Sequence, residues 1–189
     1  MNSQSNAMSE LGLIVSGFCP AYLKNKRWFL KKNSEIKEVT LKDCWTLKTG
    51  QDRIMVNSII DVSYKEGRND LYFLPFAIST DDAGVGFIYR VSIGGFDLSI
   101  YDTGNSEEYF AGFMDSLWSE LKLKSLSGGN SSVEFVCETT QKIREIKKVD
   151  VLGGELSNTI VILDKKDVVK IYRHLNPGIN PDLEVYRQL

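Results

Sequence analysis

The sequence predicts an α+β fold made mainly of antiparallel, curved sheets with few helices. Three observations lead to this class. Apolar and polar residues alternate over much of the first half of the chain, and short glycine-containing turns separate these stretches at hairpin spacing. Only one long stretch repeats its apolar residues with the period of a helix. The 189 residues are 42% hydrophobic and 11% aromatic, so the chain can bury a core without a metal or disulfide.

The first elements follow from local patterns. Residues 1–7 are polar and precede a second methionine, so they are read as an expression leader and left out of the fold. Residues 9–30 have loosely helical spacing that Pro20 interrupts, which predicts a short helix or turn. Residues 36–47 alternate between apolar and charged side chains, which predicts a half-buried strand.

Two hairpins are expected next. Residues 53–64 and 71–79 are rich in β-branched and aromatic side chains, and the polar segment between them contains a glycine. Residues 87–93 and 96–101 form a second pair around the Gly-Gly dipeptide at 94–95. Both pairs are typical of antiparallel strands.

The period then changes to that of a helix. Asn105 or Ser106 can cap its start, and Glu107 and Glu108 complement the positive end of the helix dipole. The apolar residues recur at steps of three and four, and we interpret this aromatic stripe as core rather than as a ligand-binding surface. They are Tyr109, Phe110, Phe113, Met114, Leu117, Trp118 and Leu121.

The last third of the chain consists of short segments. Residues 125–132 are rich in serine and glycine and are the best candidate for a linker. Short strands are expected at 133–137, 148–152, 160–163 and 168–172, and the first turns of a helix at 182–189.

Composition excludes several classes of protein. With 23 basic and 25 acidic residues, the net charge of -2 gives no electrostatic footprint for nucleic acid. No apolar run approaches the roughly 20 residues of a membrane span. Cys19, Cys44 and Cys137 are widely spaced and His174 is the only histidine, so neither a disulfide framework nor a zinc site is expected. Basic residues follow, rather than precede, the apolar stretch at 11–18, so we expect reduced thiols in a cytoplasmic protein.

The chemistry is expected in the C-terminal part. Its order is strand, glycine-containing turn, strand, tight turn, strand with a lysine, and helix with a glutamate. In kinases such a turn approaches the nucleotide phosphates, the strand lysine contacts them, and the helix glutamate holds the lysine. The same pattern also fits a plain hairpin with a solvent-facing lysine. The candidates are Gly153, Gly154, Ser157, Asn158 and Thr159 for the turn, Lys170 for the lysine and Glu184 for its partner.

Longer stretches add a resemblance. The tripeptide at 157–159 (SNT), the run at 170–173 (KIYR) and the run at 176–184 (NPGINPDLE) resemble the maltokinase family. These are sugar kinases of the aminoglycoside-phosphotransferase-like, protein-kinase-like group, often fused to trehalose synthase. Residues 22–23 with 27–29, and later residues 72–75, resemble the cap region of that family. Between residues 78 and 149 only the pattern of elements is similar.

The resemblance implies the N-terminal fragment of an ATP-dependent kinase that converts maltose to maltose 1-phosphate in trehalose and glycogen metabolism. Residues 8–103 would form a cap module, and residues 104–189 an intermediate and N-lobe segment that ends at the start of the helix after the lysine strand. ATP and Mg²⁺ are implied for the full-length parent only. The partners would be a C-terminal kinase lobe and a fused trehalose synthase domain, with no nucleic acid and no membrane.

No catalytic or metal-binding residue is assigned within this sequence. The catalytic-loop Asp and the carboxylates that hold Mg²⁺ in this group of kinases are not found in the required context. His174 is followed by Leu175 and Asn176, so it starts no H-x-D loop and is read as a surface residue at a strand end. The fragment alone is therefore expected to be inactive.

A second class of function stays open at this point. The chain could be a stand-alone, non-catalytic carbohydrate-binding or regulatory interaction module. Trp28, Trp45 and Tyr72 would then be exposed to stack on sugar rings, although aromatic residues in strands are more often part of a core.

Overall fold

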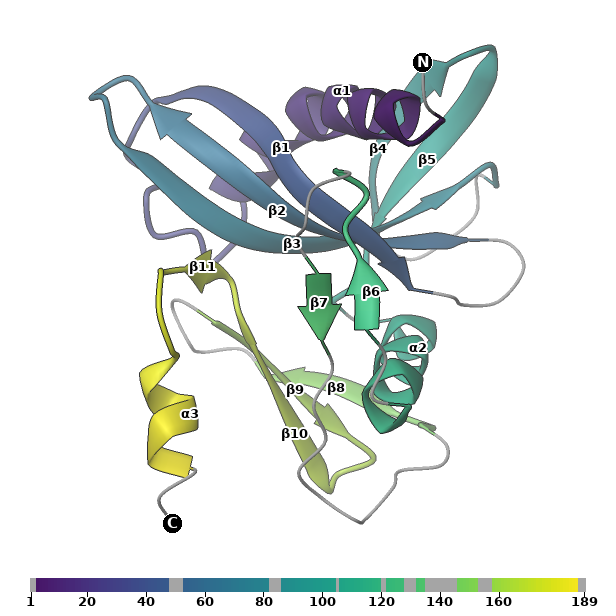
Figure 1. The fold of residues 1–189 in the computed structure, drawn as a ribbon, viewed down its shortest axis with the longest axis vertical. Coiled ribbons are helices and arrows are strands. Elements are labelled where there is room, and N and C mark those ends of the chain that lie inside the picture. The colour runs from purple at the N-terminus through teal and green to yellow at the C-terminus, as the bar shows by residue number, and fades with distance from the viewer. Residues whose placement is uncertain are drawn as a thin grey trace.

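The computed structural model has an α+β fold of mostly antiparallel strands with few helices, as the sequence predicts (Figure 1). None of its helices, within the described part of the chain, is long and apolar enough to cross a membrane. The structure describes residues 3–47, 53–81, 86–104, 106–119, 122–127, 132–134, 146–152 and 158–186.

The largest element is a six-stranded antiparallel sheet. Five strands follow the order β1-β2-β3-β5-β4, and a short strand from near the C-terminus, β11, pairs with β3. All five strand regions predicted between residues 36 and 102 are confirmed, because alternation and glycine turns are local signals. The strands are β1 (Ile36–Leu47), β2 (Ile54–Tyr64), β3 (Asn69–Ser79), β4 (Phe87–Ile93), β5 (Phe96–Asp102) and β11 (His174–Leu175).

Helix α1 (Ser3–Lys24) covers one face of this sheet (Figure 1). The prediction of a short helix or turn was wrong, since Pro20 lies inside a helix of 22 residues. Residues 3–7, interpreted as a leader, belong to the same helix. Tertiary packing of an apolar stripe outweighs the local cost of the proline. The buried residues of that stripe are Ile14, Val15, Phe18, Cys19, Tyr22 and Leu23.

Helix α2 (Glu107–Trp118) forms as predicted. Its N-cap is Ser106, whose hydroxyl accepts a hydrogen bond from the Tyr109 N–H at 3.1 Å. Tyr109, Phe110 and Met114 are buried, which confirms that the aromatic stripe is core. The Tyr109 hydroxyl donates to Asn57 Oδ1 at 2.7 Å and thereby ties α2 to β2.

The segment interpreted as a linker is held in place where it is described. It follows β6 (Lys122–Lys124), which pairs with β7 (Ser132–Glu134) in a two-stranded sheet. The Leu126 N–H donates to the Cys44 carbonyl at 2.9 Å, and the Ser125 hydroxyl bonds to the Asp43 carboxylate. These contacts with β1 do not fit a flexible linker, so that interpretation was wrong for the described residues.

The C-terminal part forms a separate small sheet. Strands β8 (Val149–Leu152), β9 (Asn158–Leu163) and β10 (Asp167–Tyr172) pair antiparallel in the order β10-β9-β8. Asp164 and Lys165 have positive φ in the tight β9–β10 turn, a conformation that Asp tolerates better than most residues. Helix α3 (Pro181–Tyr186) follows β11.

Two apolar cores result from this arrangement. The first lies between α1 and the large sheet and contains Phe18, Phe29 and Phe76. The second joins the opposite face of the large sheet to α2 and the small sheet, through Met55, Phe110 and Val161 among others (Figure 1). The chain leaves the small sheet after β10, and its next strand, β11, pairs with β3. This pairing links the backbone of the small sheet to the large sheet.

Candidate functional site

Lys170 lies on the face of the small sheet that points away from the second core. The register pairs Lys170 with Ile160 and Tyr172 with Asn158, so these four side chains share one face. The burial of β9 alternates strictly, and its buried positions begin with Thr159. Asn158 and Lys170 therefore share a face, whereas Thr159 points to the other side.

Among the described residues of α3, the acid that pairs with Lys170 is Asp182. Lys170 Nζ lies 2.9 Å from Asp182 Oδ2, and the Tyr172 hydroxyl donates to the same oxygen at 2.6 Å. Glu184, the partner that sequence reasoning selected, is exposed on the same helix. The sequence does not show which of the two acids faces Lys170, because the rotation of a short helix about its axis depends on the preceding connector.

Asp182 is held as an anion. The hydrogen bond from Tyr172, followed by the hydrogen bond and charge of Lys170, lowers the pKa of Asp182 below its usual value. The Asp182 N–H donates to Asn180 Oδ1 at 2.9 Å, which fixes the start of the helix. The result is a lysine with a defined position at the edge of an accessible face.

Apolar side chains surround Lys170 on that face. Leu152 and Val168 are 50% and 65% exposed, and Ile160 and Ile162 are half-buried beside them. Exposed aliphatic residues in a row next to a cation form a surface that suits a flat, partly apolar molecule bearing a negative charge.

Three of the predicted turn residues cannot be placed. Gly153, Gly154 and Ser157 lie outside the described residues. Asn158 begins β9 on the Lys170 face. Thr159 instead accepts a hydrogen bond from Arg173 Nε at 3.0 Å, so it belongs to the opposite face.

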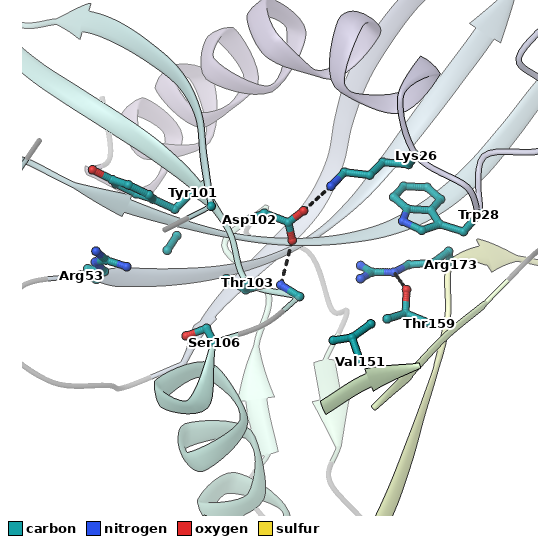
Figure 2. Close-up of a pocket in the computed structure, with 13 residues that line it drawn as sticks. Lys26, Trp28, Arg53, Tyr101, Asp102, Thr103, Ser106, Val151, Thr159 and Arg173 are labelled. Carbon is teal, nitrogen blue, oxygen red and sulfur yellow. Dashed lines mark hydrogen bonds and ion pairs between the residues drawn. The ribbon is translucent and has the colours of Figure 1, made fainter. Parts of the chain in front are cut away.

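That opposite face borders a cavity of about 430 Å³ between the large sheet, the start of α2 and the small sheet (Figure 2). Arg173, which links β10 to β11, is 3% exposed and lies with its guanidinium carbon 5.2 Å from the centre of the Trp28 ring. Its carbonyl accepts from the Phe73 N–H at 2.8 Å. Arg173 is visible in the sequence only as the last residue of the KIYR run. Its burial follows from the pairing of β11 with β3, which no local pattern predicts.

Asp102, at the end of β5, is a fully engaged carboxylate beside this cavity. It accepts from the Tyr22 hydroxyl and from the Gly104 N–H, both at 2.8 Å. It also forms an ion pair with Lys26 (Figure 2). Burial on its own would raise the pKa of Asp102, but the hydrogen bond and charge of Lys26, with the other two donors, outweigh it and lower the pKa.

The aromatic surface expected of a sugar-binding module is not present at the predicted residues. Trp28, Trp45 and Tyr72 are only 7%, 8% and 1% exposed, so they belong to the core, the interpretation that the sequence favours, and are not the exposed residues that the alternative module would need. Trp45 stacks on Phe73 with ring centres 5.9 Å apart. Tyr72 packs against the His174 ring, whose Nε2 lies 3.4 Å from the Asp70 carboxylate.

No protein-family model matches this sequence.

Within the described ranges no group of three or more His, Cys, Asp or Glu side chains could hold a metal ion. Cys19 and Cys44 are buried free thiols, and Cys137 lies outside those ranges.

Proposed function

We propose that this chain supplies the nucleotide-binding part of an ATP-dependent sugar kinase of the maltokinase type, which converts maltose to maltose 1-phosphate. The observation that carries the proposal is Lys170, held by a carboxylate of the next helix at the edge of an exposed apolar face. The order β8, β9, β10 and then, after the short strand β11, α3 supports the proposal, because kinases present their phosphate-binding turn, lysine and acidic partner on strands and a helix in this sequence.

The residues divide the binding task between them. Leu152 and Val168 offer apolar surface to a base, and Lys170 offers a point charge to the phosphates. Asp182 holds the ammonium group in place before nucleotide arrives, and Tyr172 fixes the carboxylate. ATP would supply the phosphoryl group. The described residues contain no cluster of Mg²⁺ ligands, so no step is assigned to a metal.

The proposal includes partners and a compartment. A C-terminal kinase lobe would provide the catalytic Asp and the Mg²⁺ ligands, and a trehalose synthase domain would be fused or associated. We expect the protein in the cytoplasm. The 189-residue chain by itself should show only background turnover with ATP, Mg²⁺ and maltose.

Titration of the full 189-residue chain with a fluorescent ATP analogue tests the proposal. Lys170→Ala should weaken binding about tenfold or more, because a charge-assisted contact to phosphate is lost. Lys166→Ala is the matched control, since Lys166 is an exposed lysine in the adjacent turn. Equal affinities of the wild type and a folded Lys170→Ala variant would contradict the proposal, as would no binding by the wild type at millimolar analogue.

A further inference from the structure

Two buried polar groups that line the cavity between the large and the small sheet lack a partner among the described residues. Arg173 Nη1 and Thr103 Oγ1 each lack a hydrogen-bond partner among the described residues. Arg173 is 3% exposed and Thr103 is 1% exposed, and both line the cavity (Figure 2). Buried donors are rarely left unpaired in folded proteins, because each one costs about 1–3 kcal/mol.

Arg173 is fixed in place, and none of the ion pairs between described residues includes it. Its Nε donates to Thr159, and its guanidinium lies near the Trp28 ring. Burial lowers the pKa of Arg173, but a guanidinium keeps its proton in proteins. Asp102, a described carboxylate whose charge acts on Arg173, is already bonded to Lys26, Tyr22 and Gly104. The side chain is therefore a pre-organised cation in a cavity.

The charge around the cavity suits a dianion. Among its described lining residues, Lys26, Arg53 and Arg173 carry three positive charges and Asp102 carries one negative charge, an excess of two positive charges. Arg53 lies 4.5 Å from the centre of the Tyr101 ring. A phosphomonoester carries a charge of about -1.5 to -2 near neutral pH.

We propose that this cavity binds a small organic phosphomonoester, with the phosphate on Arg173 and Thr103. The volume of about 430 Å³ is far larger than a phosphate group needs and lies in the range of small-molecule sites. Trp28, Tyr101 and Val151 provide apolar walls for the body of the ligand. The site is separate from the nucleotide surface proposed above, because Thr159 and Lys170 point to opposite faces of the small sheet.

Calorimetric titration of the 189-residue chain with phenyl phosphate, benzoate and inorganic phosphate tests the proposal. Phenyl phosphate should bind most tightly, because it combines the dianion with an apolar ring. Arg173→Met should weaken its binding about ten- to one-hundred-fold, the range of a charged hydrogen bond. The control Arg68→Met removes a positive charge from an exposed turn and should leave the affinity unchanged.

Thr103→Val keeps the test decisive if Arg173→Met fails to fold. Valine has the shape of threonine, and the hydroxyl that it removes has no partner among the described residues, so the melting temperature without ligand should not fall. The affinity for phenyl phosphate should drop about three- to tenfold. Unchanged affinity in this variant would overturn the proposal.

A further comparison separates this site from the proposed nucleotide surface. Lys170→Ala should bind phenyl phosphate as the wild type does. Loss of binding in that variant, equal or tighter binding of benzoate, or no binding by the wild type would each overturn the proposal. None of these results depends on whether the ATP analogue binds.

Discussion

The six-stranded sheet and the three-stranded sheet differ in how much of their second face is covered by other elements. Strand β2, in the middle of the large sheet, is buried along nearly its whole length, because α1 covers one face and the second core covers part of the other. Strand β9, in the middle of the small sheet, alternates between buried and half-buried positions. Both sheets are antiparallel, so the difference lies in what covers them.

The face of the small sheet that carries Leu152, Val168 and Lys170, here called the open face, is where a ligand can reach a side chain. In the large sheet, polar residues of β2 bond inward, as Ser58 does to the Leu74 carbonyl at 2.6 Å. In the small sheet, Lys170 stays accessible and pairs with the partly exposed carboxylate of Asp182. A closed sheet stabilises the molecule, whereas a half-covered sheet leaves binding surface, and this contrast can be tested by mutation.

The largest effect is expected in the first core. Phe76→Ala should lower the free energy of unfolding by about 3–5 kcal/mol, because it leaves a cavity beside Phe18, whose ring centre is 5.6 Å away. Val168→Ala, on the open face, should change it by less than about 0.5 kcal/mol. Urea unfolding measures both. A large loss in Val168→Ala would mean that the open face is covered in solution.

A smaller loss is expected at the junction of the sheets. Asp102→Asn should cost about 1–3 kcal/mol near neutral pH, because Lys26 loses its partner in a partly buried site. Asp150→Asn breaks an exposed pair with Lys148 and should cost less than about 0.5 kcal/mol.

Comparison of the wild type with Asp102→Asn also tests how the free energy of unfolding depends on pH. Because the folded protein lowers the pKa of Asp102, its contribution is complete above the unfolded pKa of about 3.9 and is lost as the pH falls through the lower folded value. The stability difference between the wild type and Asp102→Asn should therefore be constant from neutral pH to about pH 5 and shrink below about pH 4. A difference that grows in acid would contradict the assigned direction.

Local signals account for what the sequence could predict. Alternation defines the strands of both sheets, glycine turns separate strands of the large sheet, and Ser106 with its following acids defines the start of α2. The length of α1 was missed because Val15 and Cys19 are buried by contacts with the large sheet, which no local pattern reports. Pro20 is a strong local signal that these contacts override.

The candidate site was predictable in part for the same reason. Lys170 stands out because strand order and an apolar-flanked lysine are visible in the sequence. The choice between Asp182 and Glu184 depends on how α3 is rotated after the connector, which is a tertiary property. The burial of Arg173 depends on the pairing of β11 with β3, about a hundred residues apart in the chain.

An intermediate effect is expected at the N-cap of α2, the helix whose buried residues share a core with the large and the small sheet. Ser106→Ala should cost about 1 kcal/mol, because the Tyr109 N–H loses its acceptor. Ser119→Ala, at the opposite end of the same helix, should cost less than about 0.5 kcal/mol, since its contacts to the helix come from the backbone N–H. Equal losses in the two variants, measured by urea unfolding, would show that the cap hydrogen bond contributes nothing.

The smallest effect on stability is expected at the exposed pair of the open face. Asp182→Asn removes the charge that pairs with Lys170, but both side chains are partly solvated, at 47% and 34% exposure. The urea midpoint should therefore shift less than in Ser106→Ala, and added salt should remove most of the shift, because salt screens exposed pairs. Binding of the ATP analogue should respond more, since Lys170 loses the group that positions it. A large, salt-insensitive loss of stability together with unchanged analogue binding would show that Asp182 serves the fold rather than the open face.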